Sequence, residues 1–337
     1  MKEAMLYRRL DESRVHCFLC SQHCRIEPDK LGKCGVRQNR DGKLWSLVYG
    51  KLVAQHVDPV EKKPLFHFYP GTTSYSIATA GCNFTCRFCQ NADISQSPGV
   101  YGKIYGQSVS AATIAESAQK QGCATVSYTY TEPTIFMEYA LDVAALALER
   151  GLANIFVTNG YMSREALDAA APLLGAANVD LKAFNDRFYE KQCGARLKPV
   201  LATLEGMKSK GIWLEVTTLI IPGLNDSEAE LKDLARFLAA LGPETPWHVS
   251  RFFPAYRLDD RRPTPVETIS RARQIGLEAG LRYVYTGNAP GDAGENTYCH
   301  SCGTVLIKRM GYSVRKENLE NGTCVKCRTA MQGVGLD

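Results

Sequence analysis

Residues 74–91 read SYSIATAGCNFTCRFCQN, and this stretch decides the fold. Its first six residues, 74–79, form a short run with β-branched and aromatic side chains, which predicts a strand. A loop with three closely spaced cysteines follows directly, so a reactive segment leaves the end of that strand. The chain then alternates short strand patterns with helical patterns as far as residue 286, which predicts repeated βα units and a parallel sheet.

Seven strands and four helices are expected in this region. Ser163 and Ser227 are predicted to be helix N-caps. Gly122 and Gly151 follow helix ends and are predicted to adopt the left-handed conformation that ends a helix. Six or seven βα units favour an α/β fold, a partial (β/α)6-type or fuller TIM-like barrel, over a doubly wound sheet. The expected strands are 74–79, 124–130, 153–158, 178–184, 213–221, 248–253 and 282–286, and the expected helices are 110–122, 133–151, 163–174 and 227–241.

Conspicuous polar segments follow the expected strands. The cysteine loop follows the first strand, residues 131–133 (TEP) the second, residues 158–160 (TNG) the third and residues 221–226 (IPGLND) the fifth. The chemistry of (β/α) barrels gathers at the carboxyl ends of the strands. We therefore expect these segments to meet in one site.

Composition and charge exclude several classes of protein. A chain of 337 residues with 45% hydrophobic residues can bury a sizeable core. The net charge of +5 falls short of the basic stripe of a dedicated nucleic-acid binder, so nucleic acid is not indicated. No stretch approaches the roughly 18 apolar residues that cross a bilayer, and the first residues lack a signal-peptide pattern. We expect a cytoplasmic protein without a membrane partner, whose thiols ligate metals rather than form disulfides.

Eleven of the thirteen cysteines fall into three groups. The outer groups have four thiols each and the middle group has three. Four ligands close a tetrahedral metal site, whereas three leave a position for an exogenous ligand, so the middle group is predicted to be the reactive one. The groups are Cys17, Cys20, Cys24 and Cys34; Cys82, Cys86 and Cys89; and Cys299, Cys302, Cys324 and Cys327.

The C-x3-C-x2-C spacing of the middle group lets one loop supply three corners of an iron-sulfur cubane. The fourth iron can then take a bidentate ligand, and the amino and carboxylate groups of a methionine moiety suit that role. An electron from a low-potential cluster can reach the adjacent sulfonium. A zinc loop is the alternative that the spacing leaves open.

The loop CNFTCRFCQN, with Phe88 directly before its last cysteine, resembles the motif of the radical S-adenosylmethionine (SAM) superfamily. The resemblance extends over nearly the whole barrel. It implies that the three cysteines hold a [4Fe-4S] cluster that binds and reductively cleaves SAM. Residues 130–133 (YTEP) resemble the second-strand motif, whose glutamate accepts the methionine ammonium, and this role falls to Glu132. A helix-start Glu-Pro is the alternative.

Three further segments resemble glycyl-radical activating enzymes, such as the pyruvate formate-lyase activating enzymes. They are TNG with Thr158 and Asn159, DLK at 180–182, and TLIIPG at 218–223. Ordinary strand-end polarity is the alternative for each. Activating enzymes typically have an aspartate before the third-strand threonine, which helps to hold a monovalent cation. Here that residue is Val157, which argues against the cation site and against an activase. The cofactor-binding residues expected from the resemblance and from the strand ends are Glu132, Thr158, Asn159, Asp180, Lys182, Ile220 and Arg251.

A resemblance to the radical SAM member of the AmmeMemoRadiSam system covers almost the full length. It includes residues 17–39, the bridging segment 58–71 (DPVEKKPLFHFYPG), the cysteine loop, and the closing cysteines. It also includes residues 180–189, 217–226 and 248–257. No chemistry follows from the bridging segment, and a well-packed linker is its alternative role.

The outer cysteine groups read as metal sites. The C-terminal group has two CxxC knuckles on either side of a hairpin pattern at 305–314, which favours a zinc ribbon over rubredoxin-like iron or an auxiliary cluster. The N-terminal group suits either zinc, which we favour, or an auxiliary iron-sulfur cluster. His16 and His23 are alternate ligands there.

Two cysteines are left over. Cys123 is expected in the core. Cys193, beyond the fourth strand on the chemical face, is a candidate catalytic thiol that handles a radical or binds substrate, with plain packing as the alternative. Arg251 and Tyr256, after the sixth strand, are candidates for contact with SAM or substrate, with surface solvation as the alternative.

The sequence thus predicts three parts: an N-terminal Cys-rich segment and linker (1–70), a radical SAM barrel (71–290) and a zinc-ribbon-like module (291–337). The leading hypothesis is an oxidoreductase or radical transferase. It forms a 5′-deoxyadenosyl radical and abstracts hydrogen from an unidentified substrate, for which a protein or peptide is a candidate. An electron donor such as ferredoxin or flavodoxin is implied. The alternatives are a glycyl-radical-enzyme activase, and a zinc-stabilised module that binds nucleic acid or protein without catalysis.

Overall fold

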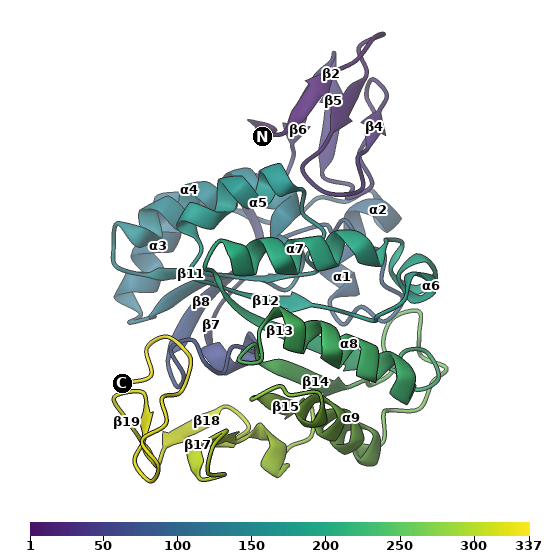
Figure 1. Ribbon diagram of the computed structural model, residues 1–337. Helices are drawn as coiled ribbons and strands as arrows, with labels where there is room; N and C mark the ends of the chain where they lie inside the picture. The colour runs from purple at the N-terminus through teal and green to yellow at the C-terminus, as the bar shows by residue number, and fades with distance from the viewer.

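The computed structural model describes all 337 residues and is built around one nine-stranded sheet (Figure 1). Seven parallel strands lie in chain order across it, as successive βα units with short connections do. Two antiparallel strands, β7 and β9, extend one edge. The parallel strands are β8 (Thr73–Thr79), β10 (Thr125–Tyr128), β11 (Ala153–Thr158), β12 (Ala176–Asp180), β13 (Trp213–Ile220), β14 (Trp247–Arg251) and β15 (Val284–Gly287), and the edge strands are β7 (Lys51–Pro59) and β9 (Gln107–Ser108).

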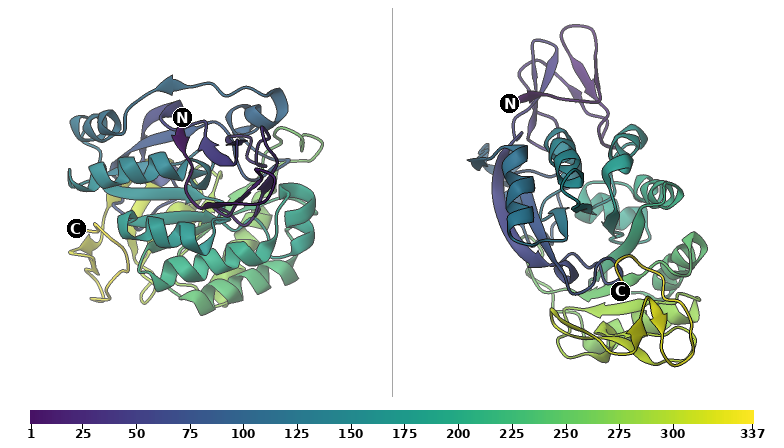
Figure 2. Two further views of the ribbon diagram at one scale, coloured as in Figure 1. Left: turned by 90° about the horizontal axis from the view of Figure 1, so that it is seen from above. Right: turned by 90° about the vertical axis from the view of Figure 1, so that its left-hand side faces the viewer.

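The sheet is curved and open (Figure 2), because β15 and β9 end the strand order without pairing to each other. The α/β fold and the partial barrel are therefore confirmed. All seven expected strands are present, but the fourth was expected too far along the chain. It ends at Asp180 because the Leu181 N–H donates to the Val179 carbonyl in a tight turn, which takes residues 181–184 out of the sheet.

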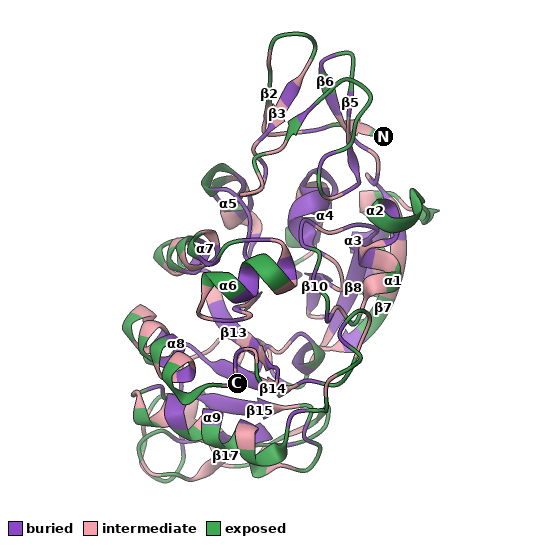
Figure 3. Ribbon diagram, turned by 90° about the vertical axis from the view of Figure 1, so that its right-hand side faces the viewer, coloured by how far each residue is buried: buried purple, intermediate pink, exposed green.

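Helices cover the outside of this sheet and turn their apolar sides inward (Figure 3). The Ser163 and Ser227 hydroxyls accept from the amides of Ala166 and Glu230, which confirms both N-caps. Gly122 and Gly151 have φ of +66° and +73°, which confirms both left-handed ends. The helices are α1 (Ala92–Ser95), α2 (Ser97–Tyr101), α3 (Ala111–Lys120), α4 (Met137–Leu148), α5 (Arg164–Ala170), α6 (Asp186–Phe188), α7 (Leu197–Ser209), α8 (Glu228–Leu241) and α9 (Val266–Glu278), with short turns η1 (Val60–Lys62), η2 (Pro133–Phe136), η3 (Ala171–Leu173), η4 (Tyr189–Cys193) and η5 (Ala293–Glu295).

Two small β structures lie at opposite ends of the molecule (Figure 1). Two three-stranded sheets form the N-terminal lobe, and short antiparallel strands form the C-terminal module. None of the helices combines the length and hydropathy that a bilayer crossing requires. The N-terminal strands are β1 (Lys2–Glu3), β2 (Tyr7–Arg9), β3 (Val15–Cys17), β4 (Arg25–Ile26), β5 (Arg37–Arg40) and β6 (Lys43–Ser46), and the C-terminal strands are β16 (Thr297–Tyr298), β17 (Val305–Met310), β18 (Ser313–Lys316), β19 (Leu319–Glu320) and β20 (Thr323–Cys324).

The bridging segment 58–71 ties the amino-terminal edge of the sheet to the C-terminal module. The Glu215 carboxylate, on β13, accepts from the backbone amides of Phe66 (3.0 Å) and His67 (2.8 Å) and from His248 Nε2 (2.7 Å). The His67 ring in turn contacts the Tyr285 hydroxyl and the Gln332 carbonyl. Glu215 is fully buried, and although burial opposes its charge, the contact with His248 leaves its pKa below the ordinary value. The segment is thus a well-packed linker, which was the alternative reading of its sequence.

We expect Glu215→Ala to lower the free energy of unfolding by about 3–5 kcal/mol, because it leaves buried donors without an acceptor. Glu228→Ala is the control, since Glu228 makes an exposed ion pair with Arg271 and should have a far smaller effect. Anaerobic denaturant titration of both variants checks this. Equal effects would show that Glu215 is not the anchor of this end of the sheet.

Candidate active site

The cysteine loop leaves the carboxyl end of β8 and is clamped from both sides. The Gly81 amide donates to the Ile94 carbonyl (3.0 Å) on α1. The Thr85 amide donates to the Cys193 carbonyl and the Arg87 amide to the Gln192 carbonyl, both at 2.9 Å. The π-helical turn η4, which follows β12, therefore fixes the loop by its backbone. The loop geometry does not depend on a metal alone.

The three thiols of the loop are spread rather than gathered on one point. Cys82 Sγ accepts from the Phe84 amide at 3.4 Å, and Cys89 Sγ lies 3.2 Å from Ser95 Oγ. Only the C-terminal cysteines bring three or more ligand atoms within 4.8 Å of one another. A cubane suits the spread set, because each of its thiolates binds a different iron. Burial raises the pKa of the Cys82 thiol well above its usual range, and a bound metal would keep it deprotonated.

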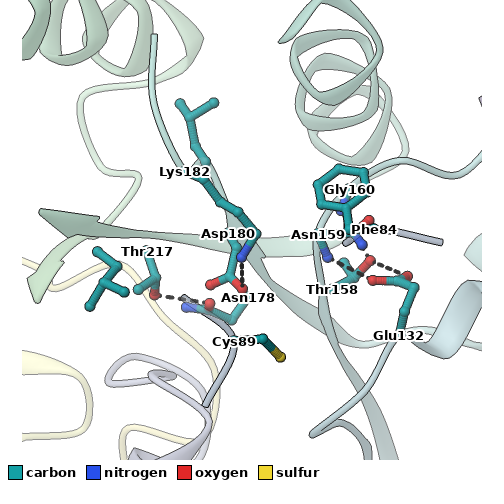
Figure 4. A network of polar contacts seen from close by, with 12 residues as sticks. Phe84, Cys89, Glu132, Thr158, Asn159, Gly160, Asn178, Asp180, Lys182 and Thr217 are labelled. Carbon is teal, nitrogen blue, oxygen red and sulfur yellow. Dashed lines mark hydrogen bonds and ion pairs between the residues drawn. The ribbon is translucent and has the colours of Figure 1, made fainter. Parts of the chain in front are cut away.

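Glu132 is the centre of a buried network beside the loop (Figure 4). Its Oε1 accepts from the amide and hydroxyl of Thr134 and from the Thr158 hydroxyl at 2.7 Å. Its Oε2 accepts one hydrogen bond, from the Asn159 amide at 2.8 Å. Burial raises the pKa of Glu132. Since a carboxylate oxygen has two lone pairs, Oε2 can take one further donor, and the expected contact with the methionine ammonium stays a prediction.

Asn159 links this network to the cysteine loop. Its Nδ2 donates to Asn83 Oδ1 at 2.7 Å and lies 3.8 Å from Cys82 Sγ. Its Oδ1 accepts from the Tyr161 amide at 3.1 Å. The expected residues Glu132, Thr158 and Asn159 thus lie together beside Cys82.

Asp180 and Lys182 lie at the end of β12 on the other side of the loop. Lys182 Nζ is 2.9 Å from Asp180 Oδ2. Burial opposes the charge of Lys182, but Asp180 and the nearby thiols of Cys86 and Cys193 hold its pKa well above the usual range. Cys193 is fully buried and its side chain approaches that of Cys86. The expected catalytic thiol therefore lies beside the reactive cysteines, and its chemical role stays a prediction.

Ile220 and Arg251 lie farther along the same edge, and no polar contact joins them to the cysteine loop. Ile220 is fully buried, and Arg251 Nε donates to the Thr264 carbonyl at 2.8 Å. The segment after β14 does reach the loop, because the Arg257 amide donates to the Arg87 carbonyl at 2.8 Å. The cofactor contacts of Ile220 and Arg251 remain predictions.

The remaining cysteines take up distinct positions. In the C-terminal group, Cys299 Sγ lies 3.5 Å from Cys327 Sγ, and Cys302 Sγ lies 3.8 Å from Cys324 Sγ. Cys123 is 5% exposed, so its place in the core is confirmed. The N-terminal four line a hollow that the cysteine loop also borders. The rings of His16 and His23 contact each other at a tilted angle, and neither residue is among those that line the hollow.

The family model described as the radical SAM superfamily matches residues 76–238, from β8 into α8. This region includes the cysteine loop, the Glu132 network and the Asp180–Lys182 pair. Residues 76–238 therefore form a radical SAM domain.

The chain is also similar to several known proteins. An uncharacterized protein of Methanocaldococcus jannaschii is 46% identical over 321 residues, which are 95% of each chain. The isethionate sulfite-lyase activating enzyme of Nitratidesulfovibrio vulgaris is 27% identical over 153 residues, 44% of this chain and 50% of that enzyme. A radical SAM methyltransferase from Sphaerobacter thermophilus shares the fold with a TM-score of 0.52, at 20% identity over 68% of this chain and 70% of that one.

Sequence reasoning missed three contributors to the site. Asn83 lies inside the motif, so its position could have been noticed. The backbone hydrogen bonds to residues 192–193 and the hydrogen bond from Arg257 join segments more than 100 residues apart in the chain. No local sequence pattern indicates such contacts.

We expect Lys182→Met to shift the midpoint potential of a cluster bound at the loop to a more negative value, on the order of 50 mV, because a nearby cation favours the reduced cluster. Lys191→Met is the control, since Lys191 is exposed on η4. Redox titration monitored by electron paramagnetic resonance (EPR) measures both. An unchanged potential in Lys182→Met would remove Lys182 from the electrostatics of the site.

Proposed function

We propose that the chain is a radical SAM enzyme in which Cys82, Cys86 and Cys89 hold a [4Fe-4S] cluster that reductively cleaves SAM, followed by hydrogen abstraction from a substrate. The observation that carries this proposal is the spread of three thiols on one clamped loop at the carboxyl edge of the sheet, within the region that matches the superfamily. An oxidoreductase or a radical transferase is the corresponding reaction class.

When bound, the cluster and SAM would supply a 5′-deoxyadenosyl radical after one-electron reduction. The residues of the chain would position the reactants. Glu132 Oε2 has a lone pair for the methionine ammonium, and the amides around it orient this carboxylate. Lys182 places a positive charge beside the thiolates. A low-potential protein such as ferredoxin or flavodoxin is the proposed electron donor.

The glycyl-radical activase is the second candidate, and its support is the similarity to the isethionate sulfite-lyase activating enzyme. That similarity covers half of the relative. Val157 is the opposing observation, because its side chain packs with the apolar cluster around Phe68 and offers no oxygen to a cation. We therefore favour a substrate other than a glycyl-radical enzyme. We also propose membership of the AmmeMemoRadiSam group, supported by the resemblance of residues 17–39 and 58–71.

We propose that the C-terminal cysteines hold a structural zinc ion. Zinc–sulfur bonds of about 2.3 Å in a tetrahedron separate the sulfurs by about 3.8 Å, which is close to the observed 3.5 and 3.8 Å. We expect Cys302→Ala to lose about one zinc per chain and to lower the thermal midpoint, with iron unchanged. Iron in place of zinc at this site would contradict the proposal.

The main proposal is tested by anaerobic reconstitution and reduction in the presence of SAM. We expect 5′-deoxyadenosine from the wild type and none from Cys82→Ala, Cys86→Ala or Cys89→Ala, each of which should lose about four irons and four sulfides. Cys123→Ala and Cys193→Ala are controls that should keep this cluster. A wild-type protein that takes up zinc alone would instead support the binding module without catalysis.

A further inference from the structure

The N-terminal cysteines surround an enclosed hollow next to the cysteine loop. Twelve residues line it, and they include all four thiols together with Arg37, Lys33 and Asn83. Cys17 ends β3, Cys20 and Cys24 lie in the turn between β3 and β4, and Cys34 lies in the turn between β4 and β5. Segments separated in sequence therefore converge on one buried space.

The separation of these four thiols differs from that of the C-terminal four. The C-terminal Sγ atoms all lie within 4.8 Å of one another, as a single tetrahedral ion requires. In the N-terminal group no three Sγ atoms meet this limit. A cubane binds each thiolate to a separate iron and so holds its thiolates farther apart. The N-terminal set shares this spread with Cys82, Cys86 and Cys89.

Two buried donors at the hollow have no acceptor. Arg37 Nε and Asn83 Nδ2 make no hydrogen bond with the protein, although Arg37 is 2% and Asn83 1% exposed. Buried polar groups are ordinarily satisfied, so each orphaned N–H indicates a missing acceptor. Arg37 already donates to Glu138 and the Met5 carbonyl through its other nitrogens. The sulfides of an anionic iron-sulfur cluster would accept from both remaining donors.

The hollow is also joined closely to the loop of the reactive cysteines. Gln22 Nε2 donates to the Asn83 carbonyl at 2.8 Å, and Lys33 Nζ contacts the Gly194 carbonyl beside Cys193. Gly81 has φ of +102°, and a Cβ there would lie 2.9 Å from the Cys34 carbonyl. Only glycine permits this approach, which brings the backbone of Cys34 against the residue before Cys82.

We propose that Cys17, Cys20, Cys24 and Cys34 hold a second [4Fe-4S] cluster, and that it passes single electrons to the cluster at Cys82, Cys86 and Cys89. The second half of this proposal rests on the proposed function. In the transfer the N-terminal cluster is oxidised by one electron and the loop cluster is reduced by one, with no bond or proton exchanged. A low-potential one-electron donor of the ferredoxin or flavodoxin class re-reduces the N-terminal cluster.

Metal and sulfide analysis of the reconstituted full-length chain tests the site. We expect about eight irons, eight sulfides and one zinc per wild-type chain. The triple variant Cys82→Ala, Cys86→Ala, Cys89→Ala should keep about four irons, and adding Cys20→Ala and Cys34→Ala should remove them. Cys123→Ala is the matched control with a buried thiol and should keep all eight. About four irons and two zincs in the wild type would overturn the proposal without any variant having to fold.

The electron transfer is tested in Cys20→Ala, Cys34→Ala with reduced flavodoxin as the probe. We expect the loop cluster to be reduced at least about tenfold more slowly than in the wild type. Rapid-freeze EPR measures this rate. An unchanged rate would overturn the relay. If SAM fails to alter the EPR signal of the loop cluster, the proposed function fails, but the iron that depends on Cys20 and Cys34 still decides the site.

Discussion

The clamped loop between β8 and α1 is the constraint on which the rest of the structure depends. Three thiols must stand apart at fixed positions, and a free loop would lose that order to conformational entropy. Backbone bonds from Thr85 and Arg87 to the turn at 192–193 supply the fixation, and Asn159 holds the other side through Asn83. The carboxyl edge of the parallel sheet gathers these partners because the loops after successive strands meet there.

The two edges of the sheet serve different purposes. At the amino-terminal edge, Glu215 satisfies several buried donors at once and joins the bridging segment to the C-terminal module. The carboxyl edge holds buried groups that leave donors or lone pairs unused, among them Asn83 Nδ2 and Glu132 Oε2. Unsatisfied polar atoms cost stability, and the unused groups at the carboxyl edge lie where they can meet a cofactor.

Much of the fold followed from local pattern. Strand runs, the N-caps at Ser163 and Ser227 and the cysteine spacing all act over a few residues, and the structure confirms them. Among the five helices that were not predicted, α7 and α9 are the two long ones. Each contains an internal glycine that disfavours a helix in isolation. Tertiary packing explains both, because a Cβ at Gly206 would lie 2.7 Å from Leu167 and one at Gly276 would lie 2.8 Å from Val284.

The candidate site was likewise predicted where local patterns decide it. The parts that were missed depend on contacts between distant segments. The motif cysteines and the Glu132, Thr158 and Asn159 cluster follow from residues at strand ends, where chain order fixes neighbours. The approach of Cys193 to Cys86, and the docking of the N-terminal lobe on the loop, depend on contacts between distant segments. Spacing alone also did not separate a single ion from a cluster at the N-terminal cysteines, since that distinction lies in the three-dimensional separation of the thiols.

The central claim is that the cluster on the loop leaves one iron for SAM. Electron-nuclear double resonance on the reduced protein, with SAM isotopically labelled at the amino nitrogen and the carboxylate, tests it most directly. The account predicts hyperfine coupling from both labels, in the wild type and equally in Cys193→Ala. Absence of coupling in the wild type, with its appearance only after removal of the Cys193 thiol, would show that the protein itself occupies the fourth iron and would contradict the account.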